Sequence, residues 1–509
     1  MGQPEDSGER PGSSRAGWSV SAAEEEAYFF VAGWDTRATE LEGQLNEPTS
    51  PPSWLVRLGL RLSIWFERWF PDAFALALVA VLVVFAACLA VGSPVIQTAR
   101  WFGAGFWDLV AFTMQMTMII ITGYAVATAP PVYRMICRMS RIPTDGRSAV
   151  GFVAFFSMVS SLLSWSFSLI FSGLLAREVA HRVPGADYRA VGAAAYLGTG
   201  SIWALGLSSS AALIMAAPGS LPRSISDISG IIPLSQTLGL WQSLVMGVTL
   251  LVVSMAIAYY SAPDRERARD MRDMGIAHES ALIDLGKPET PGEWLEFSPL
   301  LTVVIVVFGA TYLVHEVSAS GLSVLLELNH YVFGFLIVGL LLHWRPRSFV
   351  QAVGRAVPAA AGVLVQYPLY AGMVRMMTES GLAKLLAHWF IAVSTQHTFP
   401  VLVGIYSAFL GLFVPSAGGK WIIEAPYLLD AAKSLHVHLG WVVQTYNASE
   451  ALANLIHPFW MLPLLGILGL KARDIVGYTV LQFVIHVPVV LALVWGLNYT
   501  LPYLAPLLP

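Results

Sequence analysis

An apolar run near the C-terminus is interrupted at Phe413–Trp421 (FVPSAGGKW), where a simple transmembrane helix would be expected to continue. Lipid offers no hydrogen bonds, so non-helical backbone at membrane depth is tolerated only where protein or a water-lined cavity surrounds it. Pro415 removes a backbone donor, and Gly418 and Gly419 tolerate turn geometry. We interpret this stretch as the tip of a re-entrant hairpin that lines a site; a proline kink between two packed helices is the alternative.

The same stretch predicts an anion site. A helix restarting near Lys420 would aim free N–H groups and the positive end of its dipole at the break, which suits a carboxylate. We therefore interpret the chain as a carrier of small organic anions. At this tip the predicted substrate-binding residues are Ser416, Gly418, Gly419 and Lys420.

Composition assigns the broad class. With 56% hydrophobic and 12% charged residues in 509, the chain is too apolar for a soluble globule and predicts an all-α polytopic membrane protein. The chain has no block of basic residues that would suggest a nucleic-acid partner. Its N-terminus has no short basic region followed by an apolar core, so no cleavable signal peptide is expected. Cys88 and Cys137 lie in or beside apolar segments, so neither a disulfide framework nor a cysteine metal site is expected.

The N-terminal part differs from the rest. Residues 1–52 are rich in Glu, Ser, Gly and Pro and predict a disordered cytoplasmic tail. Residues 53–70 place Arg57, Arg61 and Arg68 at helical spacing among apolar residues, which predicts an interfacial amphipathic helix beside the cytoplasmic surface. A soluble amphipathic helix packed on the bundle is the alternative.

A first hairpin is predicted at Ala149–Ala176. Basic residues flank both of its ends, so the segment should enter and leave on the cytoplasmic side. Its middle, residues 161–168 (SLLSWSFS), carries four hydroxyls, which include those of the candidate binding residues Ser164 and Ser166. In the alternative, these serines bond back to their own helix within an ordinary span.

Two further apolar segments contain interruptions and predict discontinuous helices. Val191–Ala217 is broken at Gly198–Ser201 and again at Gly206–Ser210, although small residues at a helix interface would give a similar pattern. Gly440–Leu465 carries polar groups before a His-Pro pair. From these two segments the predicted substrate-binding residues are Ser208, Ser209, Ser210, Asn447, Ser449, Glu450, Asn454 and His457.

The two halves show the same order of parts in opposite orientation: two spans, a hairpin, a broken span and a final span. This order predicts an inverted repeat whose interrupted segments meet near the midplane of the membrane. An irregular bundle without pseudo-symmetry is the alternative, and no clear residue identity relates the halves. The predicted parts are a first repeat over 71–262, a cytoplasmic linker over 263–297, a connecting span over 298–316 and a second repeat over 317–509.

Several motifs resemble the bacterial short-chain fatty acid transporter family. They recur in one order over residues 65 to 495, and they are Phe66–Asp72 (FERWFPD), Gly105–Leu109 (GFWDL), Ala176–Ala180 (AREVA), Val414–Ser416 (VPS), Pro458–Pro463 (PFWMLP) and Gly469–Ile475 (GLKARDI). The resemblance implies uptake of acetoacetate and butyrate-like acids, the inverted-repeat ion transporter superfamily, and elevator-type or related alternating access. It also implies a homodimer, which is usual among elevator carriers of that superfamily.

This chain departs from the family pattern at the expected site. Ser164-Trp165-Ser166 stands where the resemblance implies Asn-Trp-Gly, and the glycine-rich break before Ser208 is thinned to Ala204-Leu205-Gly206. Ala417 replaces a glycine, and Lys420 stands where the family carries an uncharged or imidazole side chain. The resemblance therefore supports the family's fold for this chain more strongly than it supports the family's substrate.

Hypotheses from three classes of function remain. The leading hypothesis is a secondary active transporter of short-chain fatty acids or similar monocarboxylates in the bacterial inner membrane, with a cytoplasmic N-terminus. A carrier of hydroxy or dicarboxylic acids is the runner-up. A membrane enzyme is disfavoured because no HExxH or paired-carboxylate motif appears, and a receptor because no sizeable soluble domain appears. No cofactor is expected, and the coupling ion is Na⁺ or H⁺, with Glu450 and His457 as titratable candidates.

Lys420 has two available partners. Glu424, at i+4, would form a structural ion pair if this arm is helical. Glu450 could instead pair with Lys420 across the cavity of the empty carrier, and substrate carboxylate would then replace that glutamate. The sequence leaves the structural and the substrate-binding role of Lys420 open.

Deletion of residues 1 to about 50 is expected to leave transport per folded molecule unchanged, because this composition cannot bury enough apolar surface to order the segment. Uptake by the truncated and full-length carriers, normalised to inserted protein, measures this. A truncated carrier that inserts normally and has lost most of its uptake would contradict it.

Overall fold

The computed structural model describes residues 73–219, 221–266, 268–278, 285–412, 414 and 416–506. The predicted tail (1–52) and amphipathic helix (53–70) lie outside the described residues, as do Phe413 and Pro415 of the interrupted stretch and part of the linker. Across the described ranges the regular structure is entirely helical, so the all-α class is confirmed.

Six helical segments are long and apolar enough to cross a membrane, and a bent pair would make a seventh. The six are α6 (Val110–Thr128), α8 (Gly146–Leu163), the interrupted segment Tyr188–Met215, α13 (Trp241–Ser261), α15 (Pro299–Ser320) and α23 (Ala472–Asn498). The bent pair is α17 (Pro346–Glu379), whose two parts meet at 49° after Pro358, an internal proline that removes a helical hydrogen bond. A multi-pass membrane protein follows.

The other helices include α10 (Tyr188–Leu197) and α11 (Ser210–Met215), which form the two ends of the interrupted segment Tyr188–Met215. The rest are α4 (Ala73–Ala90), α5 (Val95–Gly105), α7 (Pro130–Met139), α9 (Trp165–Arg182), α12 (Arg223–Ser229), α14 (Glu293–Phe297), α16 (Leu328–His343), α18 (Leu382–Val393), α19 (Phe399–Gly411), α20 (Ala417–Ser434), α21 (Leu439–Ile456) and α22 (Leu462–Leu468). Single turns lie at η2 (Gly198–Ile202), η3 (Trp203–Leu205), η4 (Leu234–Gln236), η5 (Leu322–Leu326) and η6 (Pro458–Met461).

The structure departs from the predicted spans in three places. The helices α5 and α18 were not predicted from the sequence, because both are shorter than a membrane-crossing helix. The span predicted to begin at Val357 begins at Pro346, and its first turns carry Arg347 and Arg355. Charged residues concealed this part of the helix from a search for apolar runs.

The first predicted hairpin is present, and its break falls at Ser164. The extended backbone of this residue (φ −153°, ψ 117°) ends α8, and its hydroxyl accepts a hydrogen bond from the Phe167 amide at the start of α9. Ser168 Oγ donates to the Ser157 carbonyl at 2.7 Å and so joins the two arms. The alternative of one continuous span is therefore wrong.

The two discontinuous helices are also present. After α10, η2 forms one π turn and η3 one 3₁₀ turn; extended backbone at Gly206 follows, before Ser209 caps α11 with a bond from the Ala212 amide. In the other segment, α21 ends where His457 becomes extended, and η6 leads into α22. Wide turns of this kind free backbone groups and are frequent at functional sites.

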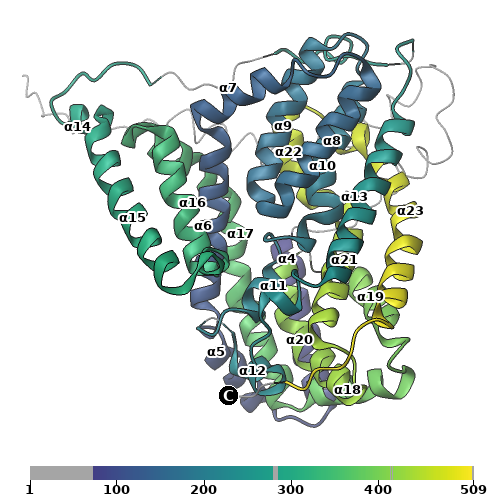
Figure 1. The fold of residues 1–509 in the computed structure, drawn as a ribbon. Coiled ribbons are helices and arrows are strands. Elements are labelled where there is room, and N and C mark those ends of the chain that lie inside the picture. The colour runs from purple at the N-terminus through teal and green to yellow at the C-terminus, as the bar shows by residue number, and fades with distance from the viewer. Residues whose placement is uncertain are drawn as a thin grey trace, which may run out of the picture. The chain divides into compact units, whose positions relative to one another are not determined.

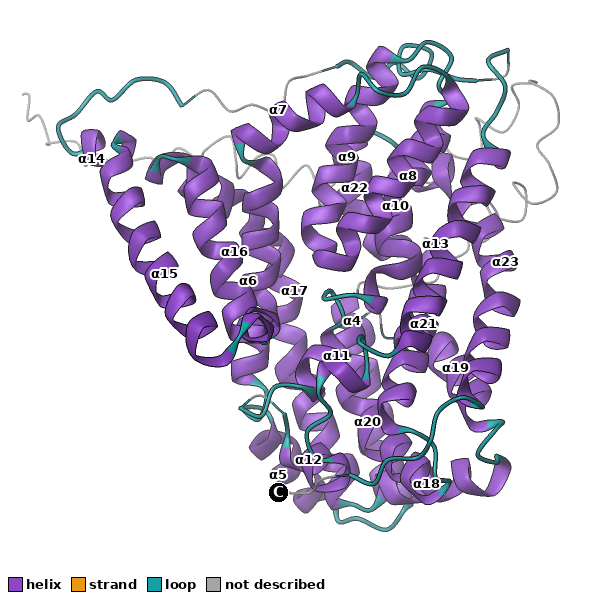
Figure 2. Cartoon of the chain, in the orientation of Figure 1, coloured by secondary structure: helices purple, strands orange, loops and turns teal. Residues whose placement is uncertain are grey.

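The second predicted hairpin is formed by α19 and α20. The new helix begins at Ala417, three residues before the predicted restart, so Lys420 lies within its first turn. Figure 1 shows α8 and α9 in the upper half of the view and α20 in the lower half, and Figure 2 shows loops between α11 and α20. This placement is what an inverted repeat requires, while the repeat itself and its boundaries stay predictions.

Part of the linker docks on the ends of α9 and α10. The Tyr188 amide donates to the Arg269 carbonyl at 2.8 Å, and the Arg269 amide donates to Asp187. His278 Nε2 lies 2.8 Å from Glu178 Oε1. The described linker residues are therefore held against the bundle although their sequence shows no sustained apolar face.

Gly206→Ala is expected to destabilise the carrier, because a Cβ at this position would lie 2.3 Å from the Leu162 carbonyl oxygen at the first hairpin. The obstacle is backbone, so the cost should be about 1–3 kcal/mol, as for overpacking elsewhere. The melting temperature of the purified carrier in detergent measures this. Gly247→Ala, where nothing lies within 4 Å, is the matched control; equal melting temperatures for both variants would contradict the expectation.

Candidate functional site

The four interrupted segments meet inside the described bundle, and close approaches at glycines show where. A Cβ on Gly206 would strike Leu162 of the first hairpin, and one on Gly200 would lie 3.2 Å from Leu455 of α21. A Cβ on Gly418 of the second hairpin would lie 3.1 Å from Ser210 Cβ of α11. Each of these contacts joins the first broken helix to one of the other three segments.

A small cavity of about 20 Å³ lies between these segments. Every lining residue comes from a hairpin tip or a broken helix. They are Trp165 from the first tip, Thr199 and Trp203 from the first broken helix, Ala417 from the second tip, and Asn454 and Trp460 from the second broken helix.

Unpaired polar atoms accompany this cavity. Thr199 Oγ1 and Trp203 Nε1 are buried and have no hydrogen-bond partner within the described part of the chain. Asn454 Nδ2 donates to the Thr199 carbonyl at 3.3 Å, and the rings of Trp165 and Trp460 meet edge to face with centroids 5.3 Å apart. Donors beside an aromatic wall suit a carboxylate with a short apolar tail.

The predicted first-tip serines face α6 instead. Ser166 Oγ donates to the Ile119 carbonyl at 3.1 Å, and the hydroxyls of Ser164 and Ser166 lie 3.3 Å apart. Tyr331 of α16 donates its hydroxyl to the Leu163 carbonyl at 2.5 Å. These hydrogen bonds give partners to the two serine hydroxyls and to the Leu163 carbonyl of the tip.

The predicted serines 208–210 hold the first broken helix in place. Ser208 Oγ donates to the Ser161 carbonyl, which links the break to the first hairpin. Ser209 Oγ donates to Asn447 Oδ1 at 2.9 Å, which links it to α21. Ser210 Oγ lies 3.5 Å from Met116 Sδ.

Glycines let the second tip approach α17 closely. A Cβ on Gly418 would lie 2.6 Å from the Tyr367 hydroxyl, and one on Gly419 would lie 2.1 Å from the Tyr370 ring. Ser416 is 6% exposed. Only glycine fits at these two positions, so their role in the structure is close packing.

Lys420 lies in a buried polar cluster with acids from two helices. Its Nζ is 2.5 Å from Glu450 Oε2 and 3.9 Å from Glu424 Oε1. Nζ also donates to the Ser407 carbonyl at 2.6 Å and lies 4.8 Å from the centre of the Tyr446 ring. Both predicted partners are therefore present, and neither Lys420 nor either glutamate lines the cavity.

Two further predicted residues are not among those that line the cavity. Ser449 Oγ bonds back to the Thr445 carbonyl of its own helix at 2.7 Å, and His457 is buried at the end of α21. Of the predicted residues, Asn454 alone is among those that line the cavity. The binding roles of the others stay predictions.

The sequence reading did not include Thr199, Trp203, Trp165 and Trp460 in the site. The signal for Thr199 was the Gly198–Ser201 interruption, and the signal for Trp165 was its place between the two tip serines. Trp203 and Trp460 carried none, because an aromatic residue in an apolar segment is ordinarily a core residue.

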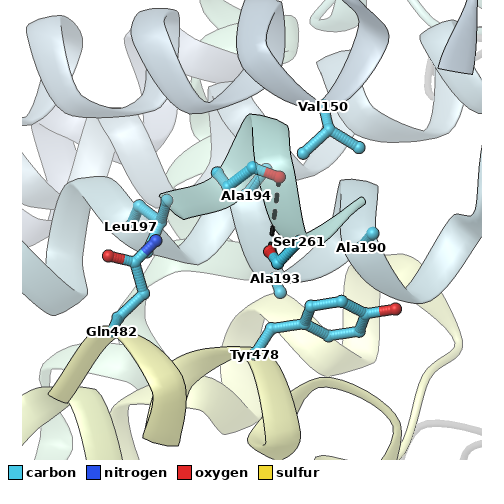
Figure 3. A pocket seen from close by; sticks show the side chains of 9 residues that line it. Val150, Ala190, Ala193, Ala194, Leu197, Ser261, Tyr478 and Gln482 are labelled. Atoms are coloured by element: carbon cyan, nitrogen blue, oxygen red, sulfur yellow. Dashed lines mark hydrogen bonds between the residues drawn. The ribbon is translucent and has the colours of Figure 1, made fainter. Parts of the chain in front are cut away.

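A second cavity, of about 10 Å³, lies between α8, α10, α13 and α23 (Figure 3). Its walls are mostly alanine and other apolar side chains. Ser261 Oγ donates to the Ala258 carbonyl there at 3.4 Å, and Gln482 donates to the Ser254 carbonyl at 3.0 Å. It contains no predicted binding residue and no charged side chain, so the first cavity is the better candidate.

A sequence profile for short chain fatty acid transporters matches residues 54–497. An Escherichia coli (strain K12) protein provisionally named a short-chain fatty acid transporter is 37% identical over 430 residues, covering 83% of this chain and 96% of that protein. A Haemophilus influenzae (strain ATCC 51907 / DSM 11121 / KW20 / Rd) protein with the same provisional name is 33% identical over 440 residues, covering 85% and 98%.

Two solved structures have a similar fold. The YdaH transporter of Alcanivorax borkumensis, described as having an unusual topology, gives a TM-score of 0.55 at 16% identity, over 84% of this chain and 98% of that one. MtrF of Neisseria gonorrhoeae, described as illuminating a class of antimetabolite efflux pumps, gives 0.54 at 12% identity, over 88% and 98%. At these identities the likeness concerns the fold alone.

Lys420→Gln is expected to destabilise the carrier by about 3–5 kcal/mol, because it leaves the buried Glu450 charge without its cation. Adding Glu450→Gln should restore much of the loss, since the double variant buries no unpaired charge at this contact. Melting temperatures and the yield of monodisperse protein measure this. A single variant as stable as the unmodified carrier would contradict the structural role and favour the substrate-binding role of Lys420.

Proposed function

Because this chain belongs to the short-chain fatty acid transporter family, we propose that it is a secondary active transporter that carries short-chain fatty acids or similar small monocarboxylates by alternating access. The observation that carries the proposal is the cavity walled by both hairpin tips and both broken helices. Sites of this kind lie at the centre of inverted-repeat carriers, between half-helices whose free backbone groups face the substrate.

The chemistry of the cavity supports a monocarboxylate. Thr199 and Trp203 line the cavity, and their hydroxyl and indole N–H, which have no partner within the described part of the chain, are the candidate donors to a carboxylate. Trp165, Trp460 and Ala417 then offer apolar surface for a short tail. No lining residue carries a positive charge, so the second carboxylate of a dicarboxylic acid would be buried without a counter-charge.

The arrangement also supports an orientation and a location. Arg134, Arg138, Arg141 and Arg147 gather around α7 and the start of α8, and such clusters favour the cytoplasmic side of a membrane. The first hairpin then opens to the cytoplasm and the second to the outside. We propose a carrier in the bacterial inner membrane with a cytoplasmic N-terminus, coupled to Na⁺ or H⁺.

Purified carrier in proteoliposomes should exchange radiolabelled butyrate against internal butyrate. Trp203→Phe should raise the apparent KM about tenfold or more with normal expression, because it removes one donor to a charged group and keeps an aromatic ring. Trp421→Phe is the matched control, since its indole N–H is also buried and unpaired yet does not line the cavity.

The outcomes of this exchange experiment test the proposed substrate class and the role of Trp203 independently. Absence of butyrate exchange by the unmodified carrier would overturn the proposed substrate class. An unchanged KM in well-folded Trp203→Phe would remove this residue from the site.

Cysteines placed at Ser164 and Ser416, after replacement of Cys88 and Cys137 by serine, should change accessibility in opposite senses between inward-open and outward-open states. Hairpins that open to opposite faces require this. Aqueous thiol reagents applied from one side report it. Equal labelling of both positions from that side in every state would contradict the inverted-repeat interpretation.

A further inference from the structure

Lys420, Glu424 and Glu450, here called the buried triad, lie out of contact with solvent. Their side chains are 0%, 0% and 1% exposed. Lys420 and Glu424 come from α20, and Glu450 comes from α21. The binding site proposed above uses none of the three, although each is an ionisable group inside a membrane protein, where such groups are rare and mostly functional.

The charges of the triad do not balance. One ammonium faces two carboxylates, so full ionisation would leave one negative charge in a site shielded from solvent. Among the described residues, the other titratable groups that face it are phenols: Tyr367 from α17, Tyr406 from α19, Tyr427 from α20 and Tyr446 from α21. None of these supplies a second cation. Burying an uncompensated charge is costly, whereas one added proton makes the triad neutral.

Geometry separates the two carboxylates. Glu450 lies 2.5 Å from the ammonium and pairs with it directly. Glu424 lies 3.9 Å from the same ammonium. Its Oε2 contacts the Ser407 hydroxyl, which can either donate to a carboxylate or accept from a carboxylic acid. Glu424 is therefore the carboxylate that can hold a proton and keep a partner.

The triad is connected to the substrate cavity through two elements. The Tyr446 hydroxyl, whose ring lies beside Lys420, donates to the carbonyl of the cavity residue Ala417 at 2.5 Å. Glu450 and the cavity residue Asn454 lie one turn apart on α21. Lys420 lies in the first turn of α20, directly behind the second tip. Movement of that tip would change the distance between Lys420 and the two acids.

We propose that the buried triad is the coupling site of this carrier, and that Glu424 binds one hydrogen ion in each transport cycle. In the loading step, one H⁺ from water adds to the Glu424 carboxylate and forms an O–H bond. In the release step, that bond breaks and the proton returns to water on the other side. One H⁺ and one monocarboxylate anion then cross together, so each transport cycle moves no net charge. This inference rests on the proposed transport function.

The test uses the full-length carrier in proteoliposomes, with [¹⁴C]butyrate and protein-free vesicles as the background for passive acid diffusion. Under an inside-alkaline pH gradient, the unmodified carrier should take up butyrate at an initial rate above that of the protein-free vesicles, and an inward Na⁺ gradient alone should give no accumulation. Glu424→Gln copies the protonated acid, so it should keep butyrate counterflow within about twofold and lose gradient-driven accumulation. Glu379→Gln, an exposed acid at the end of α17, is the matched control and should behave like the unmodified carrier.

The outcomes are distinguishable. Gradient-driven accumulation by Glu424→Gln, loss of counterflow in a well-folded Glu424→Gln carrier, or accumulation driven by Na⁺ alone would each overturn the coupling site. Absence of counterflow by the unmodified carrier would instead overturn the proposed function.

A second measurement does not depend on the variant folding. A trapped pH dye should report one H⁺ entering per butyrate, above the protein-free background, in the unmodified carrier. A membrane potential set by valinomycin and K⁺ without a pH gradient should drive no butyrate accumulation. Accumulation driven by the potential alone would contradict electroneutral coupling at the triad.

Discussion

The fold depends on one constraint: a backbone that leaves the helical conformation inside a membrane must find its hydrogen bonds in the protein itself. The first tip meets this need through Tyr331, which donates to Leu163, and through Ser208, which donates to Ser161. The second tip meets it through Tyr446 and Ala417. Bonds between the segments thus hold the breaks together, and this leaves the unpaired donors of Thr199 and Trp203 beside the cavity.

Charge obeys the same constraint. Lys420 gains an ion pair, a backbone carbonyl and an aromatic face, so its burial is compensated behind the tip rather than inside the cavity. The cavity then relies on neutral donors and aromatic walls. Substrate recognition and charge compensation are thereby assigned to neighbouring sets of residues on the same helices, which is an arrangement through which a carrier could couple two ligands.

Much of the architecture could be predicted because its causes are local. Apolar runs of membrane-crossing length and the break at Ser164 follow from residue type and spacing, and the structure contains them. The candidate site could be predicted only in part. Asn454 was identified because a polar side chain in an apolar helix needs a reason, whereas Trp203 and Trp460 resemble ordinary core residues until the fold places them beside an unfilled space.

By itself the sequence determined the class of the protein, its family and the positions of its helix breaks, because hydropathy, proline, glycine and serine act on the chain within a few residues. Only the tertiary structure decided which polar groups share a cavity and which acid Lys420 contacts most closely. Glu424 at i+4 and Glu450 on another helix were equally available in the sequence. The packing of α20 against α21 brought Glu450 to 2.5 Å, because contacts between distant segments depend on how the helices pack.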